Sequence, residues 1–223
     1  SLFLNTSSYS QVNQTFNSTS SFTVPAGVNF LSVEAWGAGG RGGSLTSPGA
    51  AGGGGGGAYS LKTIAVIPGN TYTVHVGQGS NSSLPGGDSW FENSSIILAK
   101  GGNSVIDNDL NGAIGGQSTN CIGDIVFSGG NGANGSYAAS QYGGGGGSSA
   151  GISQHGNHAS GYPGAIAPSQ GGNGGNGQSA TQGNGSAATG VGGGGGGALV
   201  TGAGTASGGS GDNRKIVISW IPV

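Results

Sequence analysis

Two histidines stand three residues apart in a glycine-rich stretch, in the order His155-Gly156-Asn157-His158. Closely spaced imidazoles are a common part of zinc sites, but a zinc ion needs about four protein or solvent ligands. No carboxylate or cysteine lies near this pair in the sequence. The sequence therefore predicts ordinary surface or core histidines at these positions and no metal site.

A second stretch, residues 37–42, fits the spacing G-x-G-x-x-G that cradles the phosphates of dinucleotides. That fingerprint also needs a helix directly after it and an acidic residue about twenty positions further on. Here more glycines and Pro48 follow, and residues 59–64 contain no acid. The chain also has no G-K-[ST] phosphate-binding loop. We interpret the match as a consequence of composition and expect no cofactor.

Nucleophilic catalysis would need a buried acid, a histidine and an activated nucleophile. His75 lies on the polar side of a predicted strand, and no catalytic motif surrounds the many serines near it. Cys121 is the single cysteine, so an internal disulfide or a cysteine-based zinc site is excluded. It reads as a small buried residue or as a bridge to another molecule. The sequence thus predicts a protein that is not an enzyme and has no catalytic residues.

The composition leaves little material for a side-chain core. Of 223 residues 56 are glycine, 33% are hydrophobic and only 5% are charged, whereas about 25% are charged in a typical domain. Disordered chains usually combine high net charge with few strand-forming residues. This chain has a net charge of −2 and clear strand-like runs, which argues against disorder. Something besides apolar burial must therefore hold most of the chain together.

The charge and hydropathy patterns also exclude two classes of partner. The five basic residues form no stripe, so the electrostatic footprint of a nucleic-acid-binding protein is missing. No run of 18 apolar residues occurs, so no membrane-spanning helix is expected.

Strand signals occur where apolar and polar residues alternate. They cover residues 22–36 with a turn at 24–27, residues 58–66 and 71–76 as a predicted hairpin around Pro68-Gly69-Asn70, and residues 215–221 at the end, with a weaker signal at 90–99. No segment has uninterrupted helical periodicity. The residues Ile216, Ile218 and Trp220, or the alternate face Val217 and Ile221, are expected to pack with Leu31, Val33 and Tyr72 in one small core.

Glycine fills the rest of the chain, in tracts at residues 52–57, 143–147 and 192–197 and in triplets that place asparagine every third residue at 171–177. A period of three is that of a polyproline-II helix, whose backbone makes no internal hydrogen bonds. Its N–H and C=O groups need partners outside the helix. We therefore predict a mainly β fold with essentially no α-helix, in which a small antiparallel sheet or sandwich anchors laterally packed polyglycine-II helices. Valine at Gly174 or Gly194 should unfold it, and a change at Asn176 should be mild.

The first 13 residues carry an apolar load with no local partner, made up of Leu2, Phe3, Leu4, Tyr9 and Val12. We predict an extended segment at 1–13 and a single glycine-rich domain at 14–223. A small sheet leaves open edges that must be covered or paired. The segment is expected to add as a strand to the next subunit, giving a head-to-tail homopolymer. The competing interpretation is that it covers an edge of its own sheet.

Sequons for N-glycosylation are more frequent than the roughly four that chance gives at this composition. They lie at Asn5, Asn13, Asn17, Asn81, Asn93, Asn134 and Asn184. They indicate either a glycosylated surface or plain richness in asparagine and serine.

Several motifs in a fixed order resemble the glycine-rich domain family of phage tail fibres and of bacterial and archaeal surface proteins. They are Phe22-Thr23-Val24-Pro25-Ala26-Gly27-Val28, then Leu31-Ser32-Val33-Glu34-Ala35-Trp36 running into glycines, then Pro68-Gly69-Asn70-Thr71-Tyr72-Thr73-Val74-His75-Val76-Gly77, and a closing strand at 215–220. The resemblance runs from about Gln14 to the end. It implies a small β-sheet with layers of glycine helices, in adhesive or structural surface proteins, and no catalytic residues.

The leading functional hypothesis is a self-assembling structural subunit of an extracellular filament or surface layer. One alternative is a phage tail-fibre adhesin at the virion tail tip, whose loops at residues 136–141 and 152–168 contact a receptor on the host. A second alternative is an ice-binding or ligand-binding glycine-rich module. The partners expected are further copies of the chain, glycans or a cell-surface receptor, and the expected location is extracellular or at the cell surface.

Overall fold

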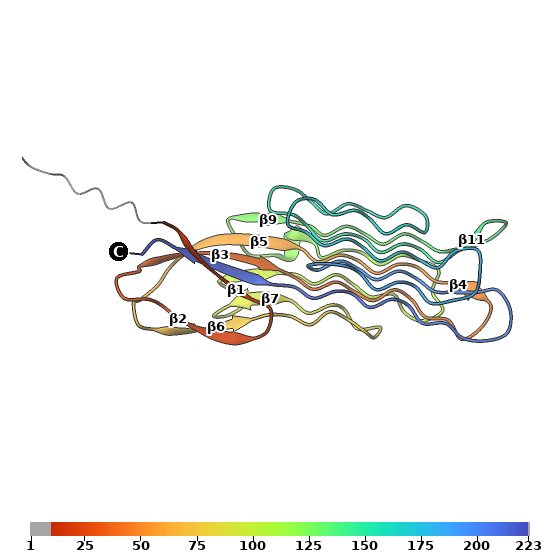
Figure 1. The fold of residues 1–223 in the computed structure, drawn as a ribbon, viewed down its shortest axis with the longest axis horizontal. Coiled ribbons are helices and arrows are strands. Elements are labelled where there is room, and N and C mark those ends of the chain that lie inside the picture. The colour runs from red at the N-terminus through yellow and green to blue at the C-terminus, as the bar shows by residue number, and fades with distance from the viewer. Residues whose placement is uncertain (1–9, 223) are drawn as a thin grey trace, which may run out of the picture.

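Two antiparallel sheets face each other at one end of the molecule, and glycine-rich segments run from them to the other end (Figure 1). The structure is a computed structural model and describes residues 10–222. The chain enters and leaves at the sandwich end, whereas the loops near β4 and β11 lie at the far end (Figure 1). We call these the proximal end and the distal end.

The first sheet has five strands in the order β1-β13-β3-β5-β9. Their bounds are Val12–Phe16 for β1, Ile216–Trp220 for β13, Phe30–Trp36 for β3, Tyr59–Ala65 for β5 and Ile125–Phe127 for β9. The last strand of the chain thus inserts between β1 and β3, with Ile218 opposite Gln14 on one side and Val33 on the other.

The second sheet has four strands in the order β2-β6-β7-β8. They span Ser20–Thr23 for β2, Thr71–His75 for β6, Ser89–Phe91 for β7 and Ile97–Ala99 for β8. The predicted hairpin at 58–76 is therefore wrong, because β5 pairs with β3 in one sheet and β6 pairs with β2 in the other. The turn around Gly69 carries the chain between sheets, held there by N–H donation from Gly69 to the Val24 carbonyl.

The main core lies between the sheets. Alternation places Leu31 and Val33 of β3 against Ile216 and Ile218 of β13, and all four side chains are fully buried. Tyr72 and Trp220 pack on this cluster from its margin, with Val24, Val74, Phe91 and Ile97 completing its centre. The predicted joint core of the closing strand with Leu31, Val33 and Tyr72 is confirmed.

The opposite face of the first sheet is covered by the glycine-rich part. Trp36 and Tyr59 are buried there against Ala150, and the Trp36 indole N–H donates to the Ala150 carbonyl at 3.2 Å. The Tyr59 hydroxyl donates to Glu34 at 2.7 Å, and burial together with this bond raises the pKa of Tyr59. A second apolar contact thus joins the sandwich to the glycine layers.

The tract at 52–57 shows how glycine builds those layers. The N–H groups of its first three glycines donate in turn to the carbonyls of Asp109, Ala133 and Gly195. The N–H groups of the next three donate, in the same order, to Asn103, Gly130 and Gly192. Every third N–H therefore reaches the same neighbouring segment. Its carbonyls accept from three other segments, through N–H groups of residues 40 and 43, 113 and 116, and 147 and 150. Hydrogen bonds thus surround the tract with neighbouring segments, as the predicted three-residue period requires.

Short elements complete the fold. β4 at Gly49–Ala50 pairs with β12 at Leu199–Val200, and β10 at Ser136–Tyr137 pairs with β11 at Gln141–Tyr142. One 3-10 turn, η1 at Ser118–Asn120, is the only helical element in the part of the chain that the structure describes. The fold is mainly β with antiparallel sheets, as predicted.

The N-terminal segment begins its pairing within its own chain. β1 starts at Val12, two residues ahead of the predicted domain start at Gln14, and Val12 lies opposite Trp220 of β13. As far as residues 12–16 are concerned, the segment covers an edge of its own sheet. Leu2, Phe3, Leu4 and Tyr9 lie outside the described residues.

Candidate functional site

The dinucleotide-like stretch at 37–42 is part of the glycine lattice. A Cβ added to Gly37 would lie 2.1 Å from the Lys100 carbonyl oxygen, and one added to Gly39 would lie 1.8 Å from that of Gly193. Real Cβ atoms do not come this close, so neighbouring backbone already fills the space that a phosphate cradle would keep open. The glycines here serve close packing between segments.

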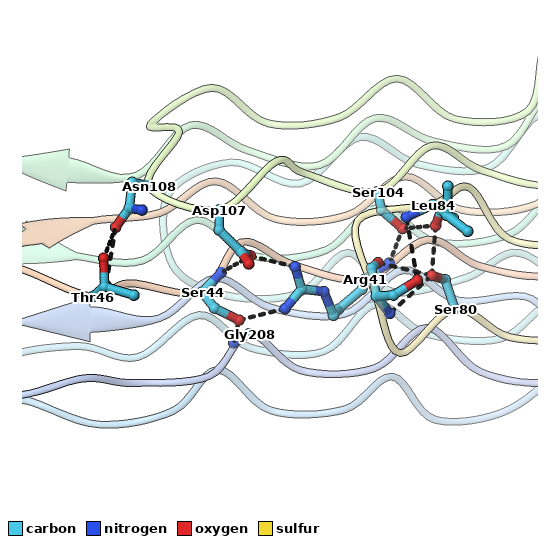
Figure 2. A network of polar contacts seen from close by, with 10 residues as sticks. Arg41, Ser44, Thr46, Ser80, Leu84, Ser104, Asp107, Asn108 and Gly208 are labelled. Atoms are coloured by element: carbon cyan, nitrogen blue, oxygen red, sulfur yellow. Dashed lines mark hydrogen bonds and ion pairs between the residues drawn. The ribbon is translucent and has the colours of Figure 1, made fainter.

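Arg41, inside the same stretch, forms a polar clamp with residues of neighbouring lattice segments (Figure 2). Its buried guanidinium donates to the Ser44 hydroxyl and to Oδ1 of Asp107. Asp107 also accepts the Ser44 N–H at 3.2 Å, and the Ser44 hydroxyl accepts the N–H of Gly208 at 3.0 Å. The clamp therefore joins three segments that are distant in the sequence.

The charge state of Asp107 follows from this clamp. Partial burial on its own would raise the pKa of the carboxyl. The hydrogen bonds from Arg41 and Ser44, together with the charge of Arg41, outweigh burial and lower that pKa below its ordinary value. The Arg41 guanidinium and the Ser44 N–H thus hold Asp107 as a carboxylate. These contacts connect lattice segments.

The two spaced histidines also hold the lattice. Nδ1 of His155 accepts the N–H of Ser128 and Nδ1 of His158 accepts the N–H of Asn131, each at 2.8 Å. Within residues 10–222 no group of three histidine, cysteine or acidic residues could hold a metal ion.

Asparagines do the same at equivalent positions. Oδ1 of Asn131 and Asn134 accepts N–H groups of Gly115 and Gly112, at 3.0 and 2.8 Å. The same bond is made by Asn173 to Ala167, by Asn176 to Gly164 and by Asn184 to Ser207. In the outer layers, asparagine side chains three residues apart therefore accept backbone N–H groups of the neighbouring segment.

His75 and Cys121 are placed in structural surroundings. His75 stacks on Trp90 with 4.4 Å between ring centroids and 7° between planes. The Cys121 sulfur is half-buried, accepts the N–H of Lys100 and donates to the Gln117 carbonyl, each at 3.4 Å. Burial raises the pKa of the Cys121 thiol, which favours its protonated form.

The sequon asparagines in the described part of the chain are all exposed, and Asn5 lies outside it. Asn13 and Asn17 lie in and just after β1, and Asn81 and Asn93 lie in loops. Asn134 and Asn184 use Oδ1 for the lattice bonds described above. An N-linked glycan attaches to Nδ2, so these bonds leave the attachment atom available.

A concave site with a volume of about 670 Å³ lies at the distal end. It is lined by Ala138, Ala139, Ser140, Gln141, Tyr142, Tyr162, Ser179 and Ala180. We call it the distal cavity. The loops at 136–141 and 152–168, which the adhesin alternative singled out, both contribute to it. Sequence reasoning did not single out Tyr142 or Tyr162, although each adjoins a glycine at a turn of the lattice.

A second concave region lies at the proximal end. It is an apolar groove of about 480 Å³, in which Phe30 is 64% exposed and Ile221 is 61% exposed beside Trp220. Gln11, where the described chain enters the sandwich, also lines it. We call it the proximal groove.

Comparisons with known proteins identify the fold family. Among residues 10–222 no helix is long and apolar enough to cross a bilayer. A search of curated proteins found no match to the chain.

The model of the glycine-rich domain family matches residues 14–220, the same part of the chain that carries the sandwich and the lattice. The chain therefore belongs to the glycine-rich domain family.

Proposed function

We propose that this protein is a non-catalytic, extracellular adhesive protein that holds binding loops at a distance from its point of attachment. The observation that carries the proposal is the separation of the two ends of the molecule. The chain enters and leaves at the proximal end, and the distal cavity lies near β11 at the other (Figure 1). A carrier joined to either chain end would therefore present the distal loops outward.

The lattice is suited to act as a rigid spacer. Its segments are cross-linked in several directions by backbone hydrogen bonds, as the tract at 52–57 illustrates. The side chains with potential chemistry are committed to this structure, since Arg41, His155 and His158 all make lattice contacts. Exposed sequons and the resemblance to surface proteins favour an extracellular location.

The test is an adhesion assay with the protein fixed to beads through either chain end. Beads are incubated with a panel of bacterial, archaeal and eukaryotic cells, and attached cells are counted. Replacing residues 138–140 with Gly-Ser-Gly should abolish attachment, whereas Ser82→Ala, at an exposed position in another loop, should leave attachment unchanged. Attachment that survives the distal replacement, or attachment to no cell type, would overturn the proposal.

A second candidate is the filament subunit, which the proximal end favours. Within residues 10–222 the outer edge of β1 pairs with no strand, and the apolar proximal groove lies beside it. Open edges and exposed apolar surface are where another copy would add. Negative-stain microscopy and sedimentation velocity test this candidate. Concentration-dependent polymers that vanish with Phe30→Ser and Ile221→Ser would support it, and a monomer at every concentration would exclude it.

A further inference from the structure

We infer that the distal cavity binds a neutral saccharide, which packs against the aromatic pair of Tyr142 and Tyr162. The inference rests on the proposed adhesive function and names the chemical class of its ligand. The volume of about 670 Å³ is in the range of about 300–1,000 Å³ typical of small-molecule sites.

The two tyrosines offer the apolar surface that a sugar ring needs. Their ring centroids are 6.4 Å apart with 57° between the planes, and Tyr162 is 46% exposed. A pyranose ring has faces of C–H groups that pack on aromatic rings, while its hydroxyls project from the rim. Tyrosine suits this contact because it combines a rigid apolar ring with a polar tip.

The lattice fixes the backbone beside both tyrosines. Gly143, directly after Tyr142, donates its N–H to the Gln178 carbonyl at 2.7 Å. The Tyr162 carbonyl accepts the N–H of Gly177, also at 2.7 Å. Because both bonds are made to adjacent residues of one segment, the backbone positions of the two tyrosines are set relative to each other, which reduces the backbone ordering needed on binding.

The polar lining is uncharged and unpaired. Ser140, Gln141 and Ser179 line the cavity, and their side chains make no hydrogen bond to any other residue in the described part of the chain. Hydroxyl and amide groups both donate and accept, which matches sugar hydroxyls. No charged side chain lines the cavity, so an acidic sugar would bring a charge without a partner. The chemistry therefore favours neutral hexoses or N-acetylhexosamines.

A strained residue forms part of the wall. Ala180 has φ of 63°, a left-handed conformation that a residue with a Cβ rarely adopts. Its N–H donates to the Gln141 carbonyl at 3.2 Å, which ties the strained turn to the β10–β11 hairpin. Strain of this kind is retained where the surroundings fix a functional geometry, and here it sets Ser179 beside Tyr142.

The experiment begins with the whole protein on an array of oligosaccharides that contains neutral glucose, galactose, mannose and N-acetylglucosamine series and sialylated and uronic-acid series. Affinity for the strongest neutral oligosaccharide is then measured by calorimetry. Replacing Tyr142 and Tyr162 with alanine should weaken binding by about tenfold or more. Tyr137→Ala is the matched control, because Tyr137 is an exposed tyrosine of the same hairpin outside the cavity lining.

Phenylalanine at both positions provides a second variant that keeps the rings and removes only the hydroxyls. It should retain part of the affinity, with a melting temperature equal to that of the wild type. Binding to no neutral oligosaccharide, binding to acidic sugars alone, or equal loss in Tyr137→Ala would overturn the inference. If cells still attach through the distal loops while the array stays blank, the saccharide inference fails and the adhesive function stands.

Discussion

Nδ1 of His158 accepts the backbone N–H of Asn131 at 2.8 Å, and Oδ1 of Asn131 in turn accepts the N–H of Gly115 at 3.0 Å. The two side chains thus make the same kind of contact in successive layers, because each accepts a backbone N–H of the neighbouring segment. A histidine and an asparagine are interchangeable in this role because each carries a planar acceptor at a similar distance from the backbone.

This equivalence predicts how His158 responds to substitution. His158→Ala leaves the N–H of Asn131 without its partner and should lower the free energy of unfolding by about 1 kcal/mol. His158→Asn supplies a new acceptor and should recover most of that loss. Urea denaturation measures both values. Equal destabilisation by alanine and asparagine would show that the acceptor is not what matters.

Glycine positions inside the lattice should not tolerate even a methyl group. A Cβ at Gly174 would lie 1.9 Å from the Gly146 carbonyl oxygen, and one at Gly194 would lie 2.3 Å from that of Gly54. Gly174→Ala and Gly194→Ala should each destabilise by about 3 kcal/mol or more, since overpacking here must push backbone apart.

The chain contains a matched control for this experiment. A Cβ at Gly202 would meet no atom within 4 Å. Gly202→Ala should therefore change stability by less than about 0.5 kcal/mol. Thermal melts of the three variants test the prediction, and similar melting temperatures for all three would contradict a packed glycine lattice.

Burial of β13 between β1 and β3 should make a large contribution to the stability of the fold. Ile218 is fully buried in the core, whereas Ile221 just after the strand is 61% exposed. Ile218→Ala should cost about 2–5 kcal/mol and Ile221→Ala about 0.5 kcal/mol or less. Denaturant unfolding compares the two, and equal effects would show that burial in β13 does not set stability.

Acid should weaken the clamp at Arg41. The pKa of Asp107 is lowered in the folded state, so its contribution to stability is fully present above the unfolded value of about 3.9. That contribution is lost as the pH falls through the lower folded value. Asp107→Asn removes this dependence, so the gap between wild type and variant in urea midpoint should narrow from pH 6 to pH 2. A constant gap would contradict the ion pair.

The strands and the lattice could be predicted from the sequence because each has a local period. Alternation in residues 31–35 identified β3, and the tract at 52–57 does bond with a period of three. The predicted hairpin at 58–76 was wrong because a short turn at Pro68-Gly69-Asn70 serves equally well between strands of one sheet and between two facing sheets.

For the candidate site, the sequence predicted which loops contribute to it but not that these loops lie together. The segments 136–141 and 152–168 stood out as breaks between glycine tracts, but nothing local to either one indicates that they meet. Tyr142 and Tyr162 come together because Gly143 and Tyr162 bond to neighbouring residues of a third segment, at Gln178 and Gly177. Such a meeting depends on the order in which lattice segments pack, which the repetitive sequence leaves undetermined.

The interior position of early segments has a consequence for synthesis. The tract at 52–57 needs residues 192 and 195 to satisfy the N–H groups of Gly57 and Gly54. β3 is likewise synthesised early, but it pairs with β13, which lies between β1 and β3 and is synthesised last of the strands. Contacts between such distant parts of a chain form slowly. A translation product interrupted before β13 therefore has every strand of the second sheet but lacks the centre of the first sheet and several partners of the lattice. We expect such a product to be degraded more readily than the complete fold.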